Sequence, residues 1–440
     1  MISIGFIVPT WHYFSDPFKL QPLNELYFAT VLDDRFQGGV DVRVIDLREI
    51  RRNGRSLSPE NIKSLIPEKS LYLYWIAKSA DFPEIKSLVA LLRKSYPESR
   101  HAAGGIHVEI FPEECAEIFE SLVQGPGEES FTQIIIDLEK KGNKKIYKRN
   151  WREADYARYS FPRRNYLPED AVVNTVLFEK YGGVRGTSAM FSRGCNFRCA
   201  YCVYNIPHMI QRRKPEQIEA EILYLKGEYS IKAVNLRDEI CLPLSPQTAI
   251  PYLEAIGKAN IIWRGQTRVG APREILSFAK QTGCVELALG VESVSQQVLD
   301  IINKCQKVEE AKESILICRE LGIKVKMCLI LGLPGEPPDI LDKTFRFLEE
   351  VRPDYANVSG FCPAPGSPIF DNRAKFGINR IDTDWKKHAH LMMRFSNEEH
   401  FGLPFDYEET GPWGRTFSNA AIINNIKTVQ MFLRENGMSY

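Results

Sequence analysis

The sequence predicts an α/β protein with two successive parallel-sheet domains and a small α-rich C-terminal region. Strand and helix patterns alternate through the first third of the chain, and the alternation resumes after a tight cluster of cysteines. Between the two regions the composition becomes basic and aromatic without a sustained period, as in a linker. The expected parts are a domain over 1–139, a linker over 140–182, a domain over 183–372 and a C-terminal region over 373–440.

The N-terminal third reads as a doubly wound, Rossmann-like sheet. Residues 2–9 form an apolar run that ends in Pro9, as a buried parallel strand does. Ligands of such sheets lie beyond the carboxyl ends of the strands. Further strands are expected at 40–46, 70–76 and 101–104, helices at 23–32 and 83–95, and edge loops at 9–11, 77–79, 104–107 and 125–128.

The second region contains six β/α units. Six are too few to close an eight-stranded barrel, so a partial (β/α)6 barrel is expected, with reactive groups at the carboxyl ends of its strands. The expected strands lie near 188–192 and at 233–240, 261–264, 285–293, 324–336 and 354–368, and the helices at 215–229, 246–259, 272–283, 295–304, 308–321 and 339–351.

The charge balance and the cysteine content of the sequence limit the kinds of partner and the cellular compartment that we expect for this protein. The 57 basic and 56 acidic residues leave a formal charge of +1, which does not favour nucleic acid or an anionic membrane as partner. The sequence has neither a long apolar run nor the features of a signal peptide, so we expect a cytoplasmic protein without a membrane span. Ten cysteines, seven of them scattered, fit a reducing compartment better than a disulfide scaffold.

The stretch MFSRGCNFRCAYC (190–202) carries the strongest chemical signal. Cys195, Cys199 and Cys202 lie within eight residues. Three thiolates at this spacing can hold an iron–sulfur cubane and leave its fourth iron open to a small molecule. Zinc usually takes four ligands in paired spacings and no second pair exists here, so the cluster is favoured over zinc or chance clustering.

Two glycine-containing loops mark the first domain, AGGIHVEIFPEE (103–114) and QGPGEESF (124–131). Such glycines allow a backbone to approach a flat ligand closely, although their spacing is equally typical of plain turns. The candidate ligand-binding residues of this domain are Trp11, Gly104, Gly105, His107, Gly125 and Gly127.

Several motifs resemble one enzyme family. RGCNFRCAYC resembles the CxxxCxxC signature of the radical SAM superfamily, and LGVESVSQQVLDIINK and LILGLPGE resemble its later motifs. PAPGSPIFD resembles the closing strand of the subfamily that carries a B12 domain, and GGIHVEIFPEE with GPGEESF resembles that cobalamin-binding domain. The resemblance extends from residue 2 to about residue 372, but the DxHxxG motif, which supplies a histidine to cobalt in other B12 proteins, is absent.

The resemblance implies three cofactors. A [4Fe–4S] cluster on Cys195, Cys199 and Cys202 would bind S-adenosylmethionine (SAM) at its open iron, and cobalamin would occupy the N-terminal domain. An electron, from a donor such as ferredoxin or flavodoxin, would cleave SAM to a 5′-deoxyadenosyl radical that abstracts a substrate hydrogen. His107 is then either a cobalt ligand or, as is commoner for a loop histidine, a hydrogen-bonding residue.

The resemblance and simple chemistry together assign roles at the strand ends. The ammonium group of SAM requires an acceptor such as Asp238, its carboxylate suits Arg268, and ribose hydroxyls suit Glu292. For Asp238 and Glu239 a salt bridge to a neighbouring arginine is the alternative. Residues expected near adenine are Tyr201, Gly332 and Pro334, for which water exclusion or a plain turn is the competing explanation.

The remaining cysteines and histidines give weaker signals. Cys241 and Cys362 fall at expected strand ends, where a thiol could quench a substrate radical, although buried cysteines are often inert. We expect the C-terminal region to contain a helix and loop over 383–404 and to pack against the open side of the barrel. Its histidines form too weak a pattern for a metal site and are interpreted as structural or substrate-contacting: His388, His390 and His400.

The sequence therefore predicts a cobalamin-dependent radical SAM methyltransferase that acts on an unactivated carbon. The alternatives are radical dehydration, cyclisation or rearrangement without cobalamin, and a metal-stabilised RNA-binding or regulatory protein. The substrate, whether a small molecule, a lipid or a peptide, is not determined by these motifs.

Overall fold

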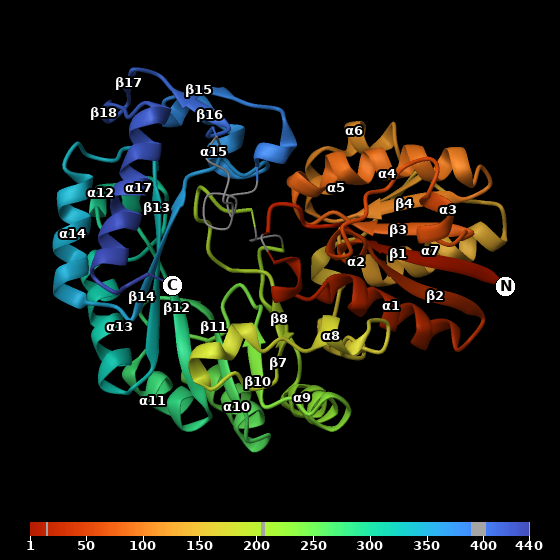
Figure 1. Ribbon diagram of the computed structural model, residues 1–440, viewed down its shortest axis with the longest axis horizontal. Helices are drawn as coiled ribbons and strands as arrows, with labels where there is room; N and C mark the ends of the chain where they lie inside the picture. The colour runs from red at the N-terminus through yellow and green to blue at the C-terminus, as the bar shows by residue number, and fades with distance from the viewer. Residues whose placement is uncertain (15, 204–206, 389–401, 440) are drawn as a thin grey trace. The chain divides into compact units, whose positions relative to one another are not determined.

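The computed structural model describes residues 1–14, 16–203, 207–388 and 402–439. It divides into two compact units, Met1–Asn174 and Thr175–Tyr440, each of which is described by itself (Figure 1). Each unit is built on a parallel sheet, so the expected α/β class is confirmed.

The first unit has a six-stranded parallel sheet in its described residues, in the order β2-β1-β3-β4-β5-β6. The bounds are β1 Ile2–Val8, β2 Val40–Asp46, β3 Leu71–Trp75, β4 Arg100–Gly104, β5 Ser121–Gln124 and β6 Ile146–Lys148. The strand order reverses between β1 and β3, which makes this the switch point where open parallel sheets bind ligands. The segment expected as linker begins with a strand, because β6 pairs with β5.

Alternating side chains separate the two faces of this sheet. Leu71 and Leu73 join the core formed with α1 Leu23–Phe36 and α7 Gly127–Glu139, whereas Tyr72 and Tyr74 of the same strand point the other way and stack with His101. Figure 1 shows α4 on the face opposite α1 and α7. The remaining helices are α2 Leu47–Arg52, α3 Ile62–Leu65, α4 Phe82–Ser95, α5 Ile106–Ile110, α6 Pro112–Ala116 and α8 Glu169–Val172.

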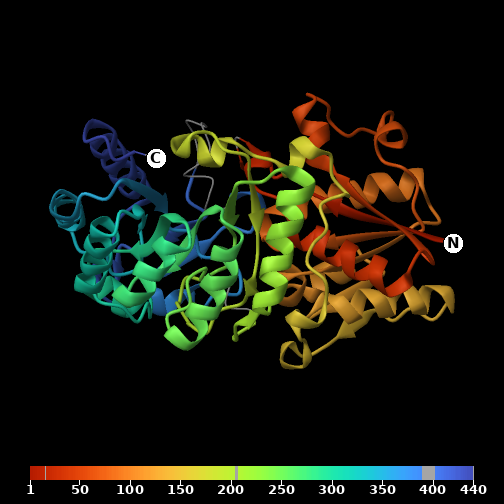
Figure 2. The same ribbon diagram turned by 90° about the horizontal axis from the view of Figure 1, so that it is seen from below.

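The second unit contains the predicted open barrel sheet. Its described strands run parallel in the order β14-β13-β12-β11-β10-β7, and neither end strand pairs with the other. Figure 2 shows α9, α10 and α11 as neighbouring green coils along one face of this sheet. The strands are β7 Gly186–Ala189, β10 Ala233–Leu236, β11 Ile262–Arg268, β12 Cys284–Glu292, β13 Lys324–Leu331 and β14 Tyr355–Gly360.

Helices connect these strands close to the expected positions. Their bounds are α9 Pro215–Tyr229, α10 Pro246–Lys258, α11 Arg273–Gln281, α12 Gln296–Ile301, α13 Val308–Glu320 and α14 Ile340–Val351. α12 ends at Ile301, earlier than the expected end at residue 304, because residues 303 and 305 adopt positive φ angles that no right-handed helix contains.

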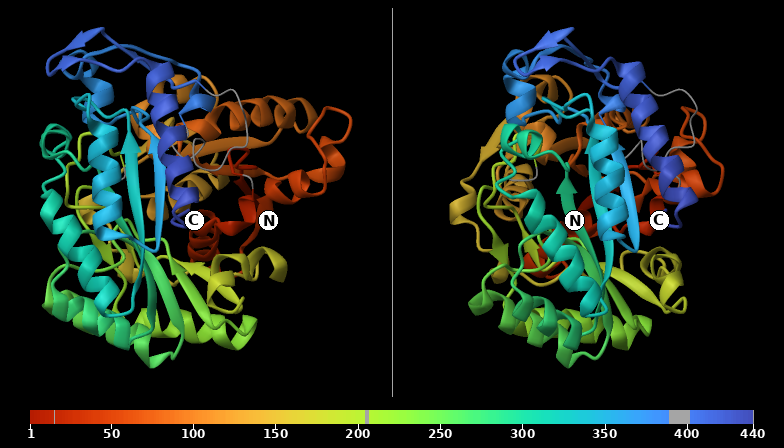
Figure 3. Two further views of the ribbon diagram at one scale, coloured as in Figure 1. Left: turned by 60° about the vertical axis from the view of Figure 1, so that its left-hand side comes forward. Right: turned by 90° about the vertical axis from the view of Figure 1, so that its left-hand side faces the viewer.

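The C-terminal region combines the expected helical character with short strands that were not expected. Its described residues form two antiparallel pairs, β15 Ile378–Ile381 with β16 Phe405–Tyr407 and β17 Thr410–Gly411 with β18 Gly414–Arg415. One long helix, α17 Asn419–Glu435, packs against β14, β13 and α14 (Figure 3). Most of the expected helix and loop at 383–404, with His390 and His400, lies outside the described residues. None of the described helices combines the length and apolar character that crossing a membrane requires.

Candidate active site

A short antiparallel ribbon closes the base of the cysteine loop. β8 Ser192–Arg193 pairs with β9 Gln211–Arg212, so the chain leaves the sheet after β7, forms the loop and returns beside itself. Gly194 has a φ of 81°, and a Cβ there would collide with the Met209 carbonyl oxygen. Glycine is therefore required immediately before Cys195.

Asp238, just after β10, fastens this ribbon to the sheet. Its carboxylate accepts hydrogen bonds from the Ser192 hydroxyl at 2.6 Å and the Phe191 amide at 3.2 Å, and the side chain is fully buried. Burial raises the pKa of Asp238 to about 6 and that of Glu239 to about 8. Both Asp238 oxygens are used on the protein's own chain, which gives it a positioning role towards the cysteine loop.

A second loop holds the other end of the cysteine turn. The Ala200 amide donates to the Ile302 carbonyl at 2.7 Å, and the Asn303 side chain donates to the Arg198 carbonyl at 2.9 Å. The Ile369 amide donates to the Ala200 carbonyl at 3.0 Å. The turn that carries Cys199 is therefore fixed by contacts with distant parts of the chain.

Arg268, at the end of β11, connects the two loops. One guanidinium nitrogen lies 3.5 Å from Cys199 Sγ, and the other donates to the Lys304 and Cys305 carbonyls. Its carbon lies 3.7 Å from the centre of the Phe197 ring, in cation–π contact. These contacts place the Arg268 guanidinium beside the cysteine turn, and its expected contact with a carboxylate of SAM stays a prediction.

Glu292, at the end of β12, is paired with a buried lysine. Lys304 Nζ lies 2.7 Å from a Glu292 carboxylate oxygen and donates to the Tyr201 hydroxyl at 3.2 Å. Burial and the neighbouring Glu292 hold the pKa of Tyr201 well above its usual value. Arg268, Glu292 and Tyr201, which the sequence singled out separately, thus belong to one network around the cysteine turn.

The two candidate thiols occupy different environments. Cys241 is fully buried, and its sulfur packs where Gly265 of β11 leaves room, which keeps it inside the core. Cys362 follows β14 and is partly exposed, with its sulfur 3.9 Å from His388 Nδ1. Burial raises the pKa of Cys362 to about 12, so its thiol stays protonated at neutral pH.

The loop after β13 is held in shape by hydrogen bonds from its backbone amides to the side chain of Glu336. A Glu336 oxygen accepts from the amides of Gly332 and Leu333 at 2.8 and 3.2 Å, while Pro334 is buried. Gly332 has a φ of 86°, and a Cβ there would lie 2.7 Å from the Ile422 side chain. This glycine therefore serves the packing of α17 as well as the turn.

The three loop cysteines fit an iron–sulfur cluster chemically. None of them is in a disulfide, and burial raises the pKa of Cys195. Among the described residues no three His, Cys, Asp or Glu side chains converge on a single metal ion. In a cubane each cysteine binds a different iron, so cluster ligands need not converge as zinc ligands do. The Arg268 guanidinium beside Cys199 supplies positive charge where thiolates would gather.

In the first unit, the candidate glycines are explained by the protein's own packing. A Cβ on Gly105 would lie 2.7 Å from the Ile76 carbonyl oxygen, and one on Gly104 would lie 2.9 Å from the Trp75 ring. A Cβ on Gly127 would lie 2.7 Å from the Phe28 ring, and one on Gly125 would collide with a backbone carbonyl. The close approaches that the sequence suggested for a ligand are made here by neighbouring chain segments.

His107 lies inside this unit and is fully buried. Its Nδ1 lies 2.9 Å from the Ser79 hydroxyl oxygen, and its ring centre lies 4.2 Å from that of Phe82. Burial lowers the pKa of His107 to about 3, so the ring is neutral. This placement fits the hydrogen-bonding alternative, and cobalt ligation by His107 stays a prediction.

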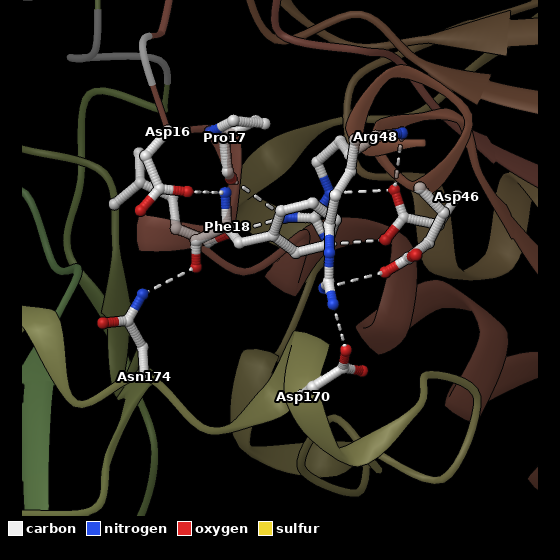
Figure 4. Close-up of polar contacts among 10 residues, drawn as sticks. Asp16, Pro17, Phe18, Asp46, Arg48, Asp170 and Asn174 are labelled. Carbon is white, nitrogen blue, oxygen red and sulfur yellow. Dashed lines mark hydrogen bonds and ion pairs between the residues drawn. The ribbon is translucent and has the colours of Figure 1, made fainter. Parts of the chain in front are cut away.

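The switch point of the first sheet carries Trp11, whose φ is 48°. The guanidinium of Arg48 lies between the rings of Trp11 and Phe18, 4.9 and 4.8 Å from their centres. Figure 4 shows Arg48 facing the carboxylate of Asp46, from which its nearest nitrogen is 2.6 Å away. The Asn174 side chain donates to the Phe18 carbonyl, and Arg48 donates to the Pro17 and Leu20 carbonyls, so these two side chains together fix residues 17–20.

Comparison with known proteins adds a match to a family model over part of the chain. Residues 190–348 match the model described as the radical SAM superfamily. The chain is 24% identical over 392 residues to an uncharacterized methyltransferase of Pyrococcus horikoshii, covering 84% of this chain and 81% of that protein. It is 32% identical over 196 residues to the anaerobic magnesium-protoporphyrin IX monomethyl ester cyclase of Cereibacter sphaeroides, covering 43% of this chain and 32% of the cyclase.

Among solved structures, the chain resembles the radical SAM methyltransferase TsrM of Kitasatospora setae. That structure holds cobalamin and a [4Fe–4S] cluster. The TM-score is 0.64 at 15% identity, covering 84% of this chain and 74% of that one. This likeness is one of fold, and it extends through most of both chains.

Proposed function

We propose that this chain is a cobalamin-dependent enzyme that methylates an unactivated carbon of its substrate, because residues 190–348 match the model described as the radical SAM superfamily. A [4Fe–4S] cluster would be held by Cys195, Cys199 and Cys202 and would bind SAM. The observation that carries the proposal is the cysteine turn, which is fixed at the carboxyl ends of an open parallel sheet with Arg268 against Cys199.

The chemistry divides between the cofactors and the chain. When bound, the cluster supplies one electron that cleaves the sulfonium of SAM and yields a 5′-deoxyadenosyl radical. Cobalamin supplies a carrier for the methyl group. The chain's own residues position these groups: Gly194 and Asp238 fix the base of the cysteine loop, and residues 302–305 fix its turn.

The first unit supports a second cofactor through its topology. Its strand order places the loops after β1 and β3 beside the switch point, and Thr10 joins them by donating to Glu84 of α4 at 2.8 Å. Lys78, after β3, lies over the rings of Tyr13 and Phe14 from the β1 loop. We place the cobalamin site at this edge, because ligands of open parallel sheets bind where the strand order reverses.

A second candidate function keeps the radical chemistry without cobalamin. It is favoured by the glycines of the first unit, whose close contacts are made by the protein itself, and by the burial of His107. The reaction would then be a dehydration, cyclisation or rearrangement. In both candidates the electron donor is a small redox protein, the substrate is a small molecule, lipid or peptide, and the compartment is the reducing cytoplasm.

Anaerobic reconstitution tests these proposals. We expect four irons per chain and reductive cleavage of SAM, both lost in Cys199→Ala and both retained in Cys115→Ala, whose cysteine lies in α6 of the first unit. Cobalamin that stays bound through gel filtration, with S-adenosylhomocysteine formed during turnover, supports methyl transfer. Retention of iron and SAM cleavage without any cobalamin binding would support the second candidate. A wild-type chain that takes up no iron would contradict both.

A further inference from the structure

The loop formed by residues 302–305 is joined to the cysteine turn by a series of hydrogen bonds. Three of its four residues reach residues 198–201, through the Ile302 carbonyl, the Asn303 amide group and the Lys304 ammonium. The fourth, Cys305, accepts a hydrogen bond from Arg268 through its carbonyl. Every residue of this short loop is thus engaged with the turn or with the arginine beside it.

Lys304 is the charged centre of this contact. Only 4% of the residue is exposed, so its ammonium depends on protein partners in place of water. It finds a carboxylate oxygen of Glu292 at 2.7 Å and the hydroxyl of Tyr201 at 3.2 Å. Tyr201 directly precedes Cys202, so a displacement of the lysine would be transmitted to a cysteine.

The backbone around this pair is held in costly conformations. Glu292, Asn303 and Cys305 have φ angles of 64°, 50° and 49°, in the left-handed region that non-glycine residues rarely adopt. Such conformations persist where surrounding contacts over-determine them, and they gather at functional sites. Two of the three flank Lys304 in sequence, and the third is its ion-pair partner.

We propose that Lys304 is a positioning residue which holds the cysteine turn in its ligand-binding shape before any iron is present. The ammonium fixes the Tyr201 hydroxyl against Glu292, and residues 302 and 303 fix the backbone on either side of Cys199, at Ala200 and Arg198. Because the turn is already ordered, binding of a cluster does not have to offset the conformational entropy that a disordered loop would lose. The role assigned to the cysteines rests on the proposed function, whereas the order of the turn in the protein without cofactors does not.

Hydrogen exchange of the apo protein tests the order of the turn directly. In Lys304→Met we expect the Ala200 amide to exchange about tenfold faster than in the wild type, because one partly buried polar contact no longer opposes local opening. Tyr201→Phe removes only a hydroxyl and should accelerate the same amide to a smaller extent. A matched control is Lys69→Met, since Lys69 is also 4% exposed and lies 2.6 Å from a carboxylate oxygen of Asp41 in the first unit.

Iron retention gives an independent readout. After reconstitution, Lys304→Met should lose iron to a chelator about tenfold faster than the wild type, and Lys69→Met should match the wild type. In the double variant Lys304→Met, Glu292→Met the unpaired buried carboxylate is also gone. Exchange that stays fast in the double variant supports positioning through Tyr201, whereas recovery of wild-type exchange would show that the lysine only neutralises Glu292.

The failures of the two proposals are distinguishable. Unchanged exchange of Ala200 and unchanged iron loss in Lys304→Met would overturn the positioning role even if the wild type binds a cluster. If the wild type binds no iron, the cluster assignment fails, and the exchange of the apo protein still decides whether Lys304 orders the turn. Exchange of α10 amides identifies a variant that has unfolded globally, and in that case Tyr201→Phe decides the outcome.

Discussion

Replacing Asp238 by asparagine should change how the stability of the second unit depends on pH. The carboxylate is fully buried and accepts hydrogen bonds from the Ser192 hydroxyl and the Phe191 amide. Asparagine keeps one acceptor oxygen but turns an NH2 group towards the other donor. The variant therefore loses a hydrogen bond, which costs about 1–3 kcal/mol of stability, but it no longer buries a charge when the pH is high enough to ionise Asp238.

The magnitude follows from the pKa of Asp238. Burial raises this pKa from 3.8 to about 6 in the folded protein, so the folded state binds the proton more tightly than the unfolded state. The stability from this group is fully present below pH 3.8 and is lost as the pH rises to about 6. Since each tenfold change in a proton-binding constant corresponds to about 1.4 kcal/mol, the total loss is about 3 kcal/mol.

Denaturant unfolding of wild type and Asp238→Asn, measured in parallel from pH 4 to pH 8, provides the assay. We expect the wild type to be more stable by about 2 kcal/mol near pH 4.5, with the advantage gone or reversed at pH 7.5. Titrating groups that do not interact with Asp238 cancel in the difference, whereas the pKa of Glu239, which the Asp238 charge helps to raise, falls in the variant. A difference in unfolding free energy that stays constant across this range would refute the reasoning, because the buried carboxylate would then not titrate in the window that its surroundings impose.

Three further outcomes are expected. Glu25→Gln should stabilise the first unit increasingly as the pH rises from 4.5 to about 8, because burial raises the pKa of Glu25 to about 8 and the wild type loses stability across this window. Thermal unfolding at pH 5 and pH 9 will therefore show the larger benefit at the higher value. Gly194→Ala should lower iron uptake, because the added Cβ would collide with the Met209 carbonyl oxygen. Gly270→Ala is the control and should not lower it, since Gly270 has a similar φ of 87° but no atom within 4 Å of the added Cβ. Equal losses of iron in the two variants would indicate that backbone strain, and not the collision, is the cause. His107→Gln should leave the absorption spectrum of bound cobalamin unchanged, since the ring lies buried beside Ser79, and a shifted spectrum would reveal cobalt ligation.

The sequence predicts the frame of the site well because its signals are local. Three cysteines in eight residues specify their own loop, and the proline at the start of α9 marks a helix without help from the rest of the chain. Even α17, whose position within the expected α-rich region was not specified, carries Ser418 as N-cap and buried apolar residues at helical spacing, among them Ile422, Ile426 and Val429.

The network around the cysteine turn could not be predicted in the same way. Lys304 lies more than a hundred positions from Tyr201, and nothing in the stretch DIINKC indicates that its lysine is buried. The glycines of the first unit show a related limit. Glycine is required both where two parts of the backbone approach closely and where a ligand approaches the backbone, so the sequence alone does not distinguish the two cases. The structure distinguishes them by the atoms that a Cβ at each glycine would meet.

The sheet of the second unit is open, so its end strand β14 has an edge that no further strand of the sheet covers, and α17 packs against this strand. β14 pairs with β13 on one side, and on the other side the described residues give it a single isolated bridge, between Ala356 and Ser439. Most backbone donors and acceptors of that edge are therefore available to a strand from another molecule. The Ala356 amide donates to the Met438 carbonyl at 2.8 Å. Loosening α17 would therefore threaten solubility first, because the uncovered edge offers a template for intermolecular β-pairing and aggregation.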